Sequence, residues 1–493
     1  MIAFTVLSIV LSGVVLADFG VEYWTITSQT SSGALYKAKT HLEELRASAR
    51  QNFYQIVSSP LTPDNCVDGQ LCYFTKDTVT DISPCSKYAQ VDVSWQVDGY
   101  PISNTTLSTY LTDPAEAITL GGDCILGYPS GPWTNLVDWN SSVSIGTPVG
   151  LDSLNGRTYI VTDTNPYLQI LSNDDLSSGS TGTSFANGFI GAGPYSAIDV
   201  ARDIATGRSY AYISTNTNTN QLQVVDVTDS NNPENSAQAT LKNVASSGSA
   251  PGGFRITYSG PDGDPSNGGI KAGIYILTQS TTGPEFHIFD ATSPSFPSEV
   301  GSRELGMTAY GMTIRDQIVS GVLRRFVYLA VGSSDPKELM VLDVTNPKNI
   351  TQVVLCTLAG NYKATSVFIL GNTLYLGRDL VPAGNSDLYA FDASDPTLAS
   401  FCNPIGQADT DSLFYSNHVI GIRGSGPYLY VAVTNTTSAH GEVQIRNSDP
   451  ATNFALISKY SFPAMSDHSI DFDGSRIYMV GRNKQVKAIF NKQ

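Results

Sequence analysis

The chain has 493 residues, a formal net charge of −16 and only 15% charged residues. This length allows two to four domains, and the acidic balance argues against nucleic acid and anionic membrane surfaces as partners. The abundance of Gly, Ser, Thr, Asn and Tyr favours a β-rich extracellular protein over a helical cytosolic enzyme.

The chain opens on an apolar segment, residues 1–17, that carries no charge, and its first basic residue is Lys37. A secretory signal peptide normally begins with a positive region, and a membrane span is normally flanked by charges. We therefore expect that a leader has already been removed and that the segment serves the mature protein as an assembly helix. Its apolar side chains are Met1, Phe4, Val6, Leu7, Ile9, Val10, Leu11, Val14, Val15 and Leu16.

An amphipathic pattern follows from residue 35, with apolar residues recurring every three or four positions. These residues are Leu35, Ala38, Leu42, Leu45, Ala49, Phe53 and Ile56. Such spacing places them on one stripe of an α-helix. The sequence therefore predicts one long helix over residues 1–57, apolar over 1–17 and amphipathic over 35–56.

Residues 58–138 have the pattern of a small β domain. Residues 88–98 alternate apolar and polar side chains, a turn at Gly99 follows, and residues 104–111 form a second strand-like segment. This arrangement is typical of a β-hairpin. Four cysteines in the same region indicate disulfides that staple the domain.

The six cysteines are Cys66, Cys72, Cys85, Cys124, Cys356 and Cys402. They show no CxxC spacing and have no histidine nearby, which argues against zinc and favours disulfides. Cys66 and Cys72 flank a turn signal and could pair across it, with Cys85 then joined to Cys124, but three pairings stay open. For Cys356 and Cys402, a disulfide and two buried thiols fit the sequence equally well.

Residues 139–493 contain an internal repeat of roughly 50 residues. In each unit a tyrosine lies in a short apolar segment, and a second apolar segment follows that ends in aspartate in four units. The tyrosines are Tyr159, Tyr212, Tyr275, Tyr328, Tyr375, Tyr430 and Tyr478, and the aspartates are Asp226, Asp290, Asp343 and Asp392. This period predicts a seven-bladed β-propeller. Because the last unit ends after its third strand, we expect residues 142–149 to supply its fourth strand and close the ring.

The segments LQVVD, FHIFD, LMVLD and LYAFD, which begin at Leu222, Phe286, Leu339 and Leu388, resemble the LVIVD-type repeats of prokaryotic cell-surface propellers. The resemblance implies the propeller fold and a location at the cell surface. It implies no particular activity.

The N-terminal region resembles type IV pilin-like proteins. Residues 32–50 (SGALYKAKTHLEELRASAR) resemble the helix of PilX-like pilins, and the strings VSW and LSTYLTD resemble strands of a pilin-like β domain. The resemblance implies a chain that polymerises through its N-terminal helix. The chain departs from the pilin pattern at Met1 and Thr5, where pilins typically have phenylalanine and glutamate.

The chain lacks the common catalytic and nucleotide-binding motifs GxSxG, HExxH, the P-loop and GxGxxG. Its histidines are scattered, and we interpret His418 and His468, which precede presumed innermost strands, as hydrogen-bonded or solvated side chains rather than ligands. The sequence therefore predicts that the protein is not an enzyme and has no cofactor and no metal site.

The predicted fold class is mainly β, with a long N-terminal α-helix (1–57), a small disulfide-stapled β domain (58–138) and a C-terminal seven-bladed β-propeller (139–493). The predicted function is a structural subunit of an extracellular type IV pilus-like filament, with the propeller displayed for surface interaction or adhesion. One alternative is a membrane-anchored or pilus-tip adhesin whose propeller binds a ligand. Another is a secreted surface enzyme with a propeller active site.

The filament hypothesis also predicts the partners and the location of the chain. Other copies of the chain would form a homo-oligomer through their N-terminal helices. Assembly would need the pilus machinery, with the chain held in the inner membrane beforehand and exposed at the cell surface afterwards. The propeller would meet a surface ligand or glycan, and nucleic acid is not expected as a partner.

Overall fold

A computed structural model of the chain divides into two compact units, Met1–Pro114 and Ala115–Gln493. In unit 1 it describes residues 30–49, 53, 56–67, 71–83, 86–97 and 102–112. In unit 2 it describes residues 136–140, 147–154, 156–162, 167–172, 183–185, 195–203, 208–215, 220–231, 233–240, 253–259, 272–278, 283–332, 337–360, 362–379, 381–382, 384–410, 417–435, 440–462, 467–473, 476–481 and 485–491.

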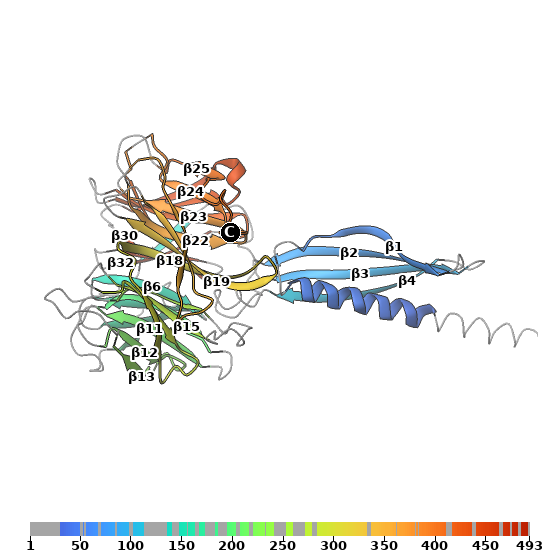
Figure 1. The fold of residues 1–493 in the computed structure, drawn as a ribbon, viewed down its shortest axis with the longest axis horizontal. Coiled ribbons are helices and arrows are strands. Elements are labelled where there is room, and N and C mark those ends of the chain that lie inside the picture. The colour runs from blue at the N-terminus through green and yellow to red at the C-terminus, as the bar shows by residue number, and fades with distance from the viewer. Residues whose placement is uncertain are drawn as a thin grey trace, which may run out of the picture. The chain divides into compact units, whose positions relative to one another are not determined.

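Unit 1 places a helix, residues 30–49, along a four-stranded antiparallel sheet (Figure 1). The strands follow one another in chain order: β1 (Ser59–Val67), β2 (Leu71–Ser83), β3 (Ser86–Val97) and β4 (Ser103–Thr112). In β3 the apolar side chains of Val91, Val93 and Trp95 are buried and pack against Ala38 and Leu42 of the helix. The alternation of apolar and polar residues in β3 thus gives the sheet one covered face.

The structure describes only part of the predicted helix. The sequence pattern predicts one helix over 1–57, whereas the described helix covers 30–49, and the ten predicted assembly residues from Met1 to Leu16 lie outside the described residues. The predicted long helix is therefore not supported by the structure. No helix in the described part of the chain is long and apolar enough to cross a membrane.

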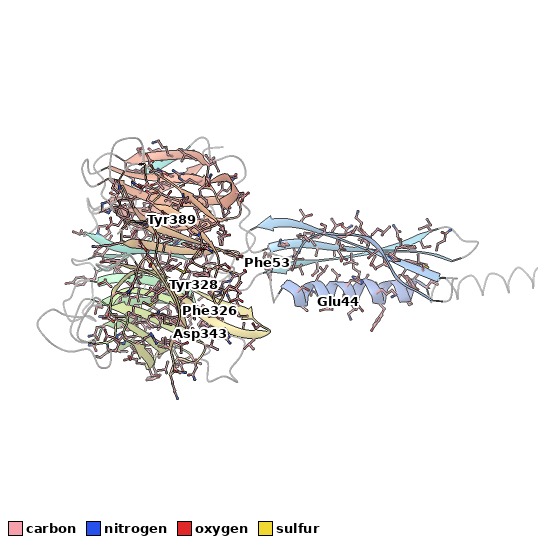
Figure 2. The ribbon with its side chains drawn as sticks, turned by 45° about the horizontal axis from the view of Figure 1, so that its top comes forward. Glu44, Phe53, Phe326, Tyr328, Asp343 and Tyr389 are labelled. Carbon is pink, nitrogen blue, oxygen red and sulfur yellow. A yellow bond between two sulfur atoms is a disulfide. The ribbon has the colours of Figure 1, made fainter. Side chains whose placement is uncertain are left out.

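The predicted apolar stripe is shifted at its start. Leu35 is 50% exposed, and Ala34 is buried in its place. The reason is the spacing of four between Ala34, Ala38 and Leu42, which keeps these side chains on the face that meets the sheet. Figure 2 shows Phe53, which packs near Ala49 beneath the same sheet.

Unit 2 is built, in its described residues, from seven four-stranded antiparallel sheets, here called blades 1–7 in chain order. Blade 1 contains β6 (Pro148–Leu154), β7 (Arg157–Thr162), β8 (Leu168–Ser172) and β9 (Thr183–Phe185). Blade 2 contains β10 (Tyr195–Arg202), β11 (Ser209–Thr215), β12 (Leu222–Asp226) and β13 (Glu234–Ala239). Blade 3 contains β14 (Gly253–Ser259), β15 (Gly273–Thr278), β16 (Phe286–Asp290) and β17 (Ser298–Arg303).

The remaining four blades repeat this pattern. Blade 4 contains β18 (Thr308–Val319), β19 (Val322–Gly332), β20 (Leu339–Asp343) and β21 (Thr351–Cys356). Blade 5 contains β22 (Ala364–Leu370), β23 (Thr373–Arg378), β24 (Leu388–Asp392) and β25 (Gly406–Ala408). Blade 6 contains β26 (Asn417–Ser425), β27 (Tyr428–Asn435), β28 (His440–Asn447), the short 3-10 helix η3 (Pro450–Thr452) and β29 (Leu456–Phe462). Blade 7 contains β30 (Asp467–Phe472), β31 (Ile477–Gly481), β32 (Gln485–Asn491) and β5 (Leu136–Asn140).

The blades form a closed ring, the arrangement of a seven-bladed β-propeller. The first strand of each blade packs against the first strand of the next, and β30 of blade 7 packs against β6 of blade 1. The first strands are therefore innermost, and each blade runs outward to its fourth strand (Figure 1). Because the ring is closed, every blade has a neighbouring blade on both sides.

The strand that closes the ring differs from the prediction. Residues 136–140 form β5, which pairs antiparallel with β32, so that Ile489 lies opposite Asp138. The predicted closing segment, 142–149, is wrong because its end already belongs to β6, the innermost strand of blade 1. Strands of the ring accordingly begin at Leu136, before the predicted boundary at 139.

The repeated tyrosines lie in the second strand of each blade and are at most 2% exposed. Tyr328, for example, packs in a cluster with Phe326 and Phe401; Figure 2 labels Phe326 and Tyr328. Phe326 and Tyr328 belong to blade 4, and Phe401 belongs to the segment between β24 and β25 of blade 5. The tyrosines are thus core residues within and between blades.

The repeated aspartates end the third strand of blades 2 to 5. In each, Oδ1 accepts a hydrogen bond from the backbone N–H two residues later, as between Asp343 and Thr345 at 2.9 Å. The same bond joins Asp226 to Thr228, Asp290 to Thr292 and Asp392 to Ser394. Such a bond shapes the turn that leads to the fourth strand. The aspartate of the repeat is therefore a turn-forming residue.

Cys356 and Cys402 form a disulfide with an S–S distance of 2.04 Å. Cys356 ends β21 of blade 4, and Cys402 follows β24 of blade 5, so the bond joins neighbouring blades. Of the two alternatives that the sequence leaves open, the disulfide is the one formed. Cys72 is also disulfide-bonded, whereas the side chains of Cys66, Cys85 and Cys124 lie outside the described residues.

Candidate functional site

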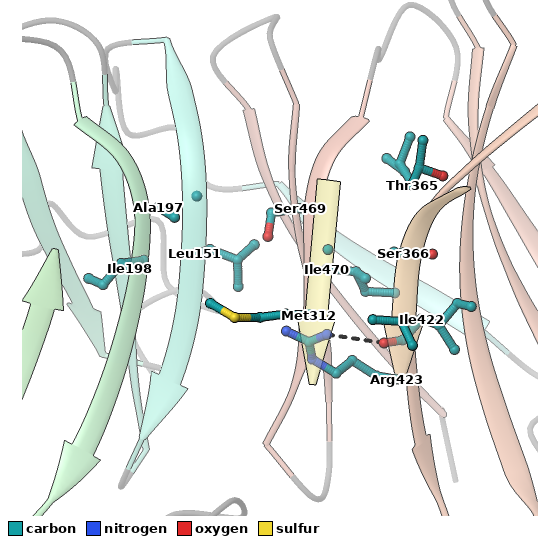
Figure 3. Close-up of a pocket in the computed structure, with 15 residues that line it drawn as sticks. Leu151, Ala197, Ile198, Met312, Thr365, Ser366, Ile422, Arg423, Ser469 and Ile470 are labelled. Carbon is teal, nitrogen blue, oxygen red and sulfur yellow. Dashed lines mark hydrogen bonds between the residues drawn. The ribbon is translucent and has the colours of Figure 1, made fainter. Parts of the chain in front are cut away.

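A central cavity lies among the innermost strands of unit 2 (Figure 3). Its lining residues come from the first strands of blades 1, 2, 4, 5, 6 and 7. It contains about 670 Å³ of empty space, part of it open to solvent. Small-molecule sites in proteins are usually concave, as this one is.

Every innermost strand has a β-bulge near its start. In each blade the pairing between the first and second strands shifts register there, for instance between Val419 and Gly421 in blade 6. A bulge bends the strand and redirects its side chains. The repeated bulges therefore set which residues of each blade face the cavity.

The register produces two layers in the wall. One layer is apolar and consists of Leu151, Ile198, Met312, Val367, Ile422 and Ile470. The residues just before them are small, namely Gly150, Ala197, Gly311, Ser366, Gly421 and Ser469. A Cβ at Gly421 would lie 2.4 Å from Cγ2 of Ile470, so this glycine permits the close approach of blades 6 and 7.

Arg423 is the one charged side chain among the described residues that line the cavity. Its Nε donates to Oδ1 of Asp471 at 2.9 Å, and its Nη1 donates to the carbonyl of Ile422 at 3.0 Å (Figure 3 draws the bond to Ile422). The side chain is 36% exposed. A guanidinium with unused N–H donors is suited to hold an anionic group.

Carboxylates beside Arg423 join neighbouring innermost strands. Asp471 of blade 7 accepts from the backbone N–H of Ser153 at 2.9 Å and from its hydroxyl, both in blade 1. Asp152 of blade 1 accepts from the backbone N–H of Val200 in blade 2. Burial raises the pKa of Asp152 well above its usual range, and the charges of Asp471 and Asp199 raise it further.

Replacing Asp152 by Asn is expected to stabilise unit 2 at about pH 8. Because the pKa of Asp152 is raised by folding, its contribution to stability is lost as the pH rises through that pKa. Asn can still accept the N–H of Val200 but never ionises. The gain in the thermal midpoint should therefore shrink toward about pH 4, which calorimetry at several pH values would measure.

The matched control is Asp392→Asn, which changes an exposed turn residue. The thermal midpoint of unit 2 in this variant should show no gain that grows with pH. A midpoint for Asp152→Asn that falls below the wild type at every pH would contradict the role given to Asp152.

A second cluster of titratable groups lies where the innermost strands of blades 5 and 6 begin. Nδ1 of His418 contacts Oδ1 of Asp379, and the N–H of Asp379 donates to the carbonyl of Lys363 at 2.8 Å. The ammonium of Lys363 lies 5.6 Å from the centre of the Tyr310 ring. Burial lowers the pKa of His418, and its Nε2 has no hydrogen-bond partner in the described part of the chain.

The other histidines are not part of either cluster in the described residues. His287 is buried in blade 3, with Nδ1 2.8 Å from Oε1 of Glu299 and Nε2 2.9 Å from the carbonyl of Pro284. The side chain of His468 lies outside the described residues. Within those residues, no three His, Cys, Asp or Glu side chains form a group that could hold a metal ion.

The sequence did not point to Arg423, Asp152 or Asp471. All three occupy the same register position, opposite the repeated tyrosines Tyr430, Tyr159 and Tyr478. A charged residue in the middle of a short apolar strand could have indicated the site from the sequence. This pattern can be recognised only after the innermost strands have been aligned by their bulges.

Comparisons with known proteins find one sequence repeat and several similar structures. The LVIVD repeat model matches residues 200–237, which span most of blade 2. No curated protein sequence matches the chain. Selenomethionine-substituted virginiamycin B lyase from Staphylococcus aureus is similar in structure, with 14% identity and a TM-score of 0.47, covering 72% of this chain and 98% of that one.

Two further solved structures are similar. A catalytically inactive variant of virginiamycin B lyase from Staphylococcus aureus with quinupristin has 14% identity and a TM-score of 0.45, covering 72% of this chain and 98% of that one. Apo AztD from Citrobacter koseri has 11% identity and a TM-score of 0.31, covering 81% of this chain and 85% of that one.

These comparisons contradict the prediction that the protein is not an enzyme. Two of the similar structures are those of a lyase, and missing catalytic motifs are no evidence against catalysis. The physical reason is that strands far apart in sequence converge at the centre of a ring, where a site needs no local motif. The similarity itself assigns no reaction to this chain.

Proposed function

We propose that the chain is a structural subunit of an extracellular type IV pilus-like filament and displays its propeller on the outside. The main support for the proposal is the arrangement of the helix and the sheet in unit 1. An amphipathic helix, residues 30–49, covers one face of a four-stranded sheet, and the sequence before it begins with the uncharged apolar segment 1–17. This order matches the pilin-like resemblance of the sequence.

The proposed assembly uses the apolar segment twice. Before assembly it holds the chain in the inner membrane, and in the filament it packs against the same segment of other copies. Exchange of lipid contacts for helix contacts gives little net hydrophobic gain, so close packing must supply the specificity. The assembly machinery in the membrane is the second partner that this proposal requires.

The second candidate is a membrane-anchored or pilus-tip adhesin whose propeller binds a ligand. The central cavity with Arg423 favours this candidate, because it offers a place for a ligand. Copy number separates the two. A filament subunit would make up most of the extracellular filament mass, and a tip adhesin would be rare in it.

Replacing Val10 by Asp in the full chain is expected to abolish filaments. A charged residue at the centre of an apolar helix costs about 2.5–3.5 kcal/mol in a membrane and leaves an unpaired charge in a helix bundle. Sheared extracellular material would be imaged and the protein quantified in it. Ser8→Ala is the matched control and should assemble as the wild type does.

The proposal fails if the wild-type protein is found only as membrane-bound monomers. It also fails if Val10→Asp assembles normally. A wild type that is present in filaments at only a few copies each would favour the tip adhesin.

A further inference from the structure

We propose that the central cavity of unit 2 binds a small carboxylate, and that Arg423 holds the carboxylate group. The inference concerns unit 2 alone and is independent of filament assembly. It rests on the hydrogen-bond donors of Arg423 that no protein acceptor uses in the described residues and on the position of Arg423 in the cavity wall.

Arg423 keeps donors available for a ligand. A guanidinium has five N–H donors in a planar fork. Two of them are used, one by Asp471 and one by the carbonyl of Ile422. Within the described part of unit 2, no further acceptor takes a hydrogen from this side chain, so Nη2 and one hydrogen of Nη1 can reach a ligand oxygen. Figure 3 shows Arg423 among the residues that line the cavity.

The cavity has limited apolar surface to offer a ligand. Ile422 and Ile470 are at most 2% exposed and pack in the core between blades. Met312 and Ile420 are the partly exposed apolar side chains among the described lining residues. A small carboxylate with a short chain therefore suits the site better than a large apolar ligand.

Asp471 is the carboxylate that forms an ion pair with Arg423 in the described residues, through Nε at 2.9 Å. Asp471 also accepts from the N–H and hydroxyl of Ser153. Burial and the charges of Asp471 and Asp199 raise the pKa of Asp152, which favours its neutral form. A ligand carboxylate would therefore bind through the η nitrogens of Arg423, on the part of the guanidinium that Asp471 does not contact.

Butyrate is the probe for the test, with butyramide and butylamine as ligands of the same size without a negative charge. We expect butyrate to shift NMR resonances of cavity residues in a saturable manner and to raise the thermal midpoint of unit 2. Butyramide and butylamine should have at least about tenfold weaker effects, because only a carboxylate accepts charge-assisted hydrogen bonds from the guanidinium.

Two variants test the site. Arg423→Gln should weaken butyrate binding at least about tenfold. Met312→Trp should block binding by filling the cavity while leaving the pair of Arg423 and Asp471 in place. This variant therefore tests the proposed site even if the Arg423→Gln protein does not fold. Arg208→Gln removes an exposed arginine that pairs with Asp226 and should bind butyrate as the wild type does.

Three results would overturn the proposal. One is the absence of any saturable response of the folded wild-type protein to butyrate. Another is binding that survives unchanged in the folded Met312→Trp protein. The third is butylamine binding as tightly as butyrate, which would assign the cavity to cations through its carboxylates.

Discussion

Replacing Arg378 by Met is expected to destabilise unit 2 by about 3–5 kcal/mol, the usual cost of removing one partner of a buried ion pair. The side chains of Arg378 and Glu338 are 1% and 0% exposed, and Nη2 of the arginine lies 3.5 Å from Oε1 of the glutamate. Nη2 also donates to the carbonyl of Ala359 at 2.7 Å, and Nη1 donates to the hydroxyl of Tyr389 at 2.9 Å. Met retains much of the volume, so the loss reports the charge and its hydrogen bonds.

The pH dependence of this loss is a sharper test than its size. Burial raises the pKa of Glu338, and the charge of Arg378 opposes that rise. Without the arginine the pKa in the folded state rises further, so stability is lost as the pH rises through it. The deficit of Arg378→Met should therefore grow between about pH 5 and pH 8.

Two variants control this prediction. The double variant Arg378→Met with Glu338→Gln removes the titrating group, so its deficit should be smaller and nearly independent of pH. Arg324→Met breaks a more exposed pair with Asp343 and should cost no more than about 1 kcal/mol. Urea unfolding of unit 2 measures all three, and a deficit of Arg378→Met that is constant with pH contradicts the account.

The second and third strands of the blades could be predicted because their pattern is local. Tyr328 and Asp343, for example, lie in consecutive apolar segments whose spacing recurs along the chain. Each residue also has a local reason for its position, burial for the tyrosine and a turn hydrogen bond for the aspartate. The period of these segments was therefore enough to predict seven blades and their order.

The first strands and the cavity could not be predicted in the same way. A shift of one residue in register moves a side chain to the other face of a strand, and every first strand contains a bulge that produces such a shift. Whether Arg423 faces the cavity therefore depends on the bulge near Gly421, which no sequence pattern marked. The choice of β5 as closing strand depended likewise on where β6 begins.

The contact between Cys356 and Cys402 also depends on the closed ring. The two residues are 46 positions apart in sequence, and their Cα atoms are 5.2 Å apart in the structure. Only the packing of blade 4 against blade 5 brings them together. The sequence could place both near the outer strands of consecutive repeats but could not decide between a disulfide and two thiols.

Replacing Cys356 and Cys402 together by Ala is expected to destabilise unit 2 by about 3–4 kcal/mol, the loop-closure value for a loop of this length. The disulfide also compensates for a weak outer edge. β25 has only three residues, and they pair with Leu388, Tyr389 and Ala390 of β24. Without the disulfide the segment from β24 to β25 should open first, because the rest of its attachment is short.

Two measurements check this expectation together. Calorimetry should show a lower midpoint for the transition of unit 2, with that of unit 1 unchanged, since Cys356 and Cys402 both belong to unit 2 and pair with each other. Hydrogen exchange should show lost protection in residues 393–408, while β27 of blade 6 remains protected. Uniform loss across all blades, or none in residues 393–408, would mean that the bond does not fasten this edge. In that case the edge must be held by the packing of Phe401 against Tyr328 and Phe391, and Phe401→Ala should open it instead.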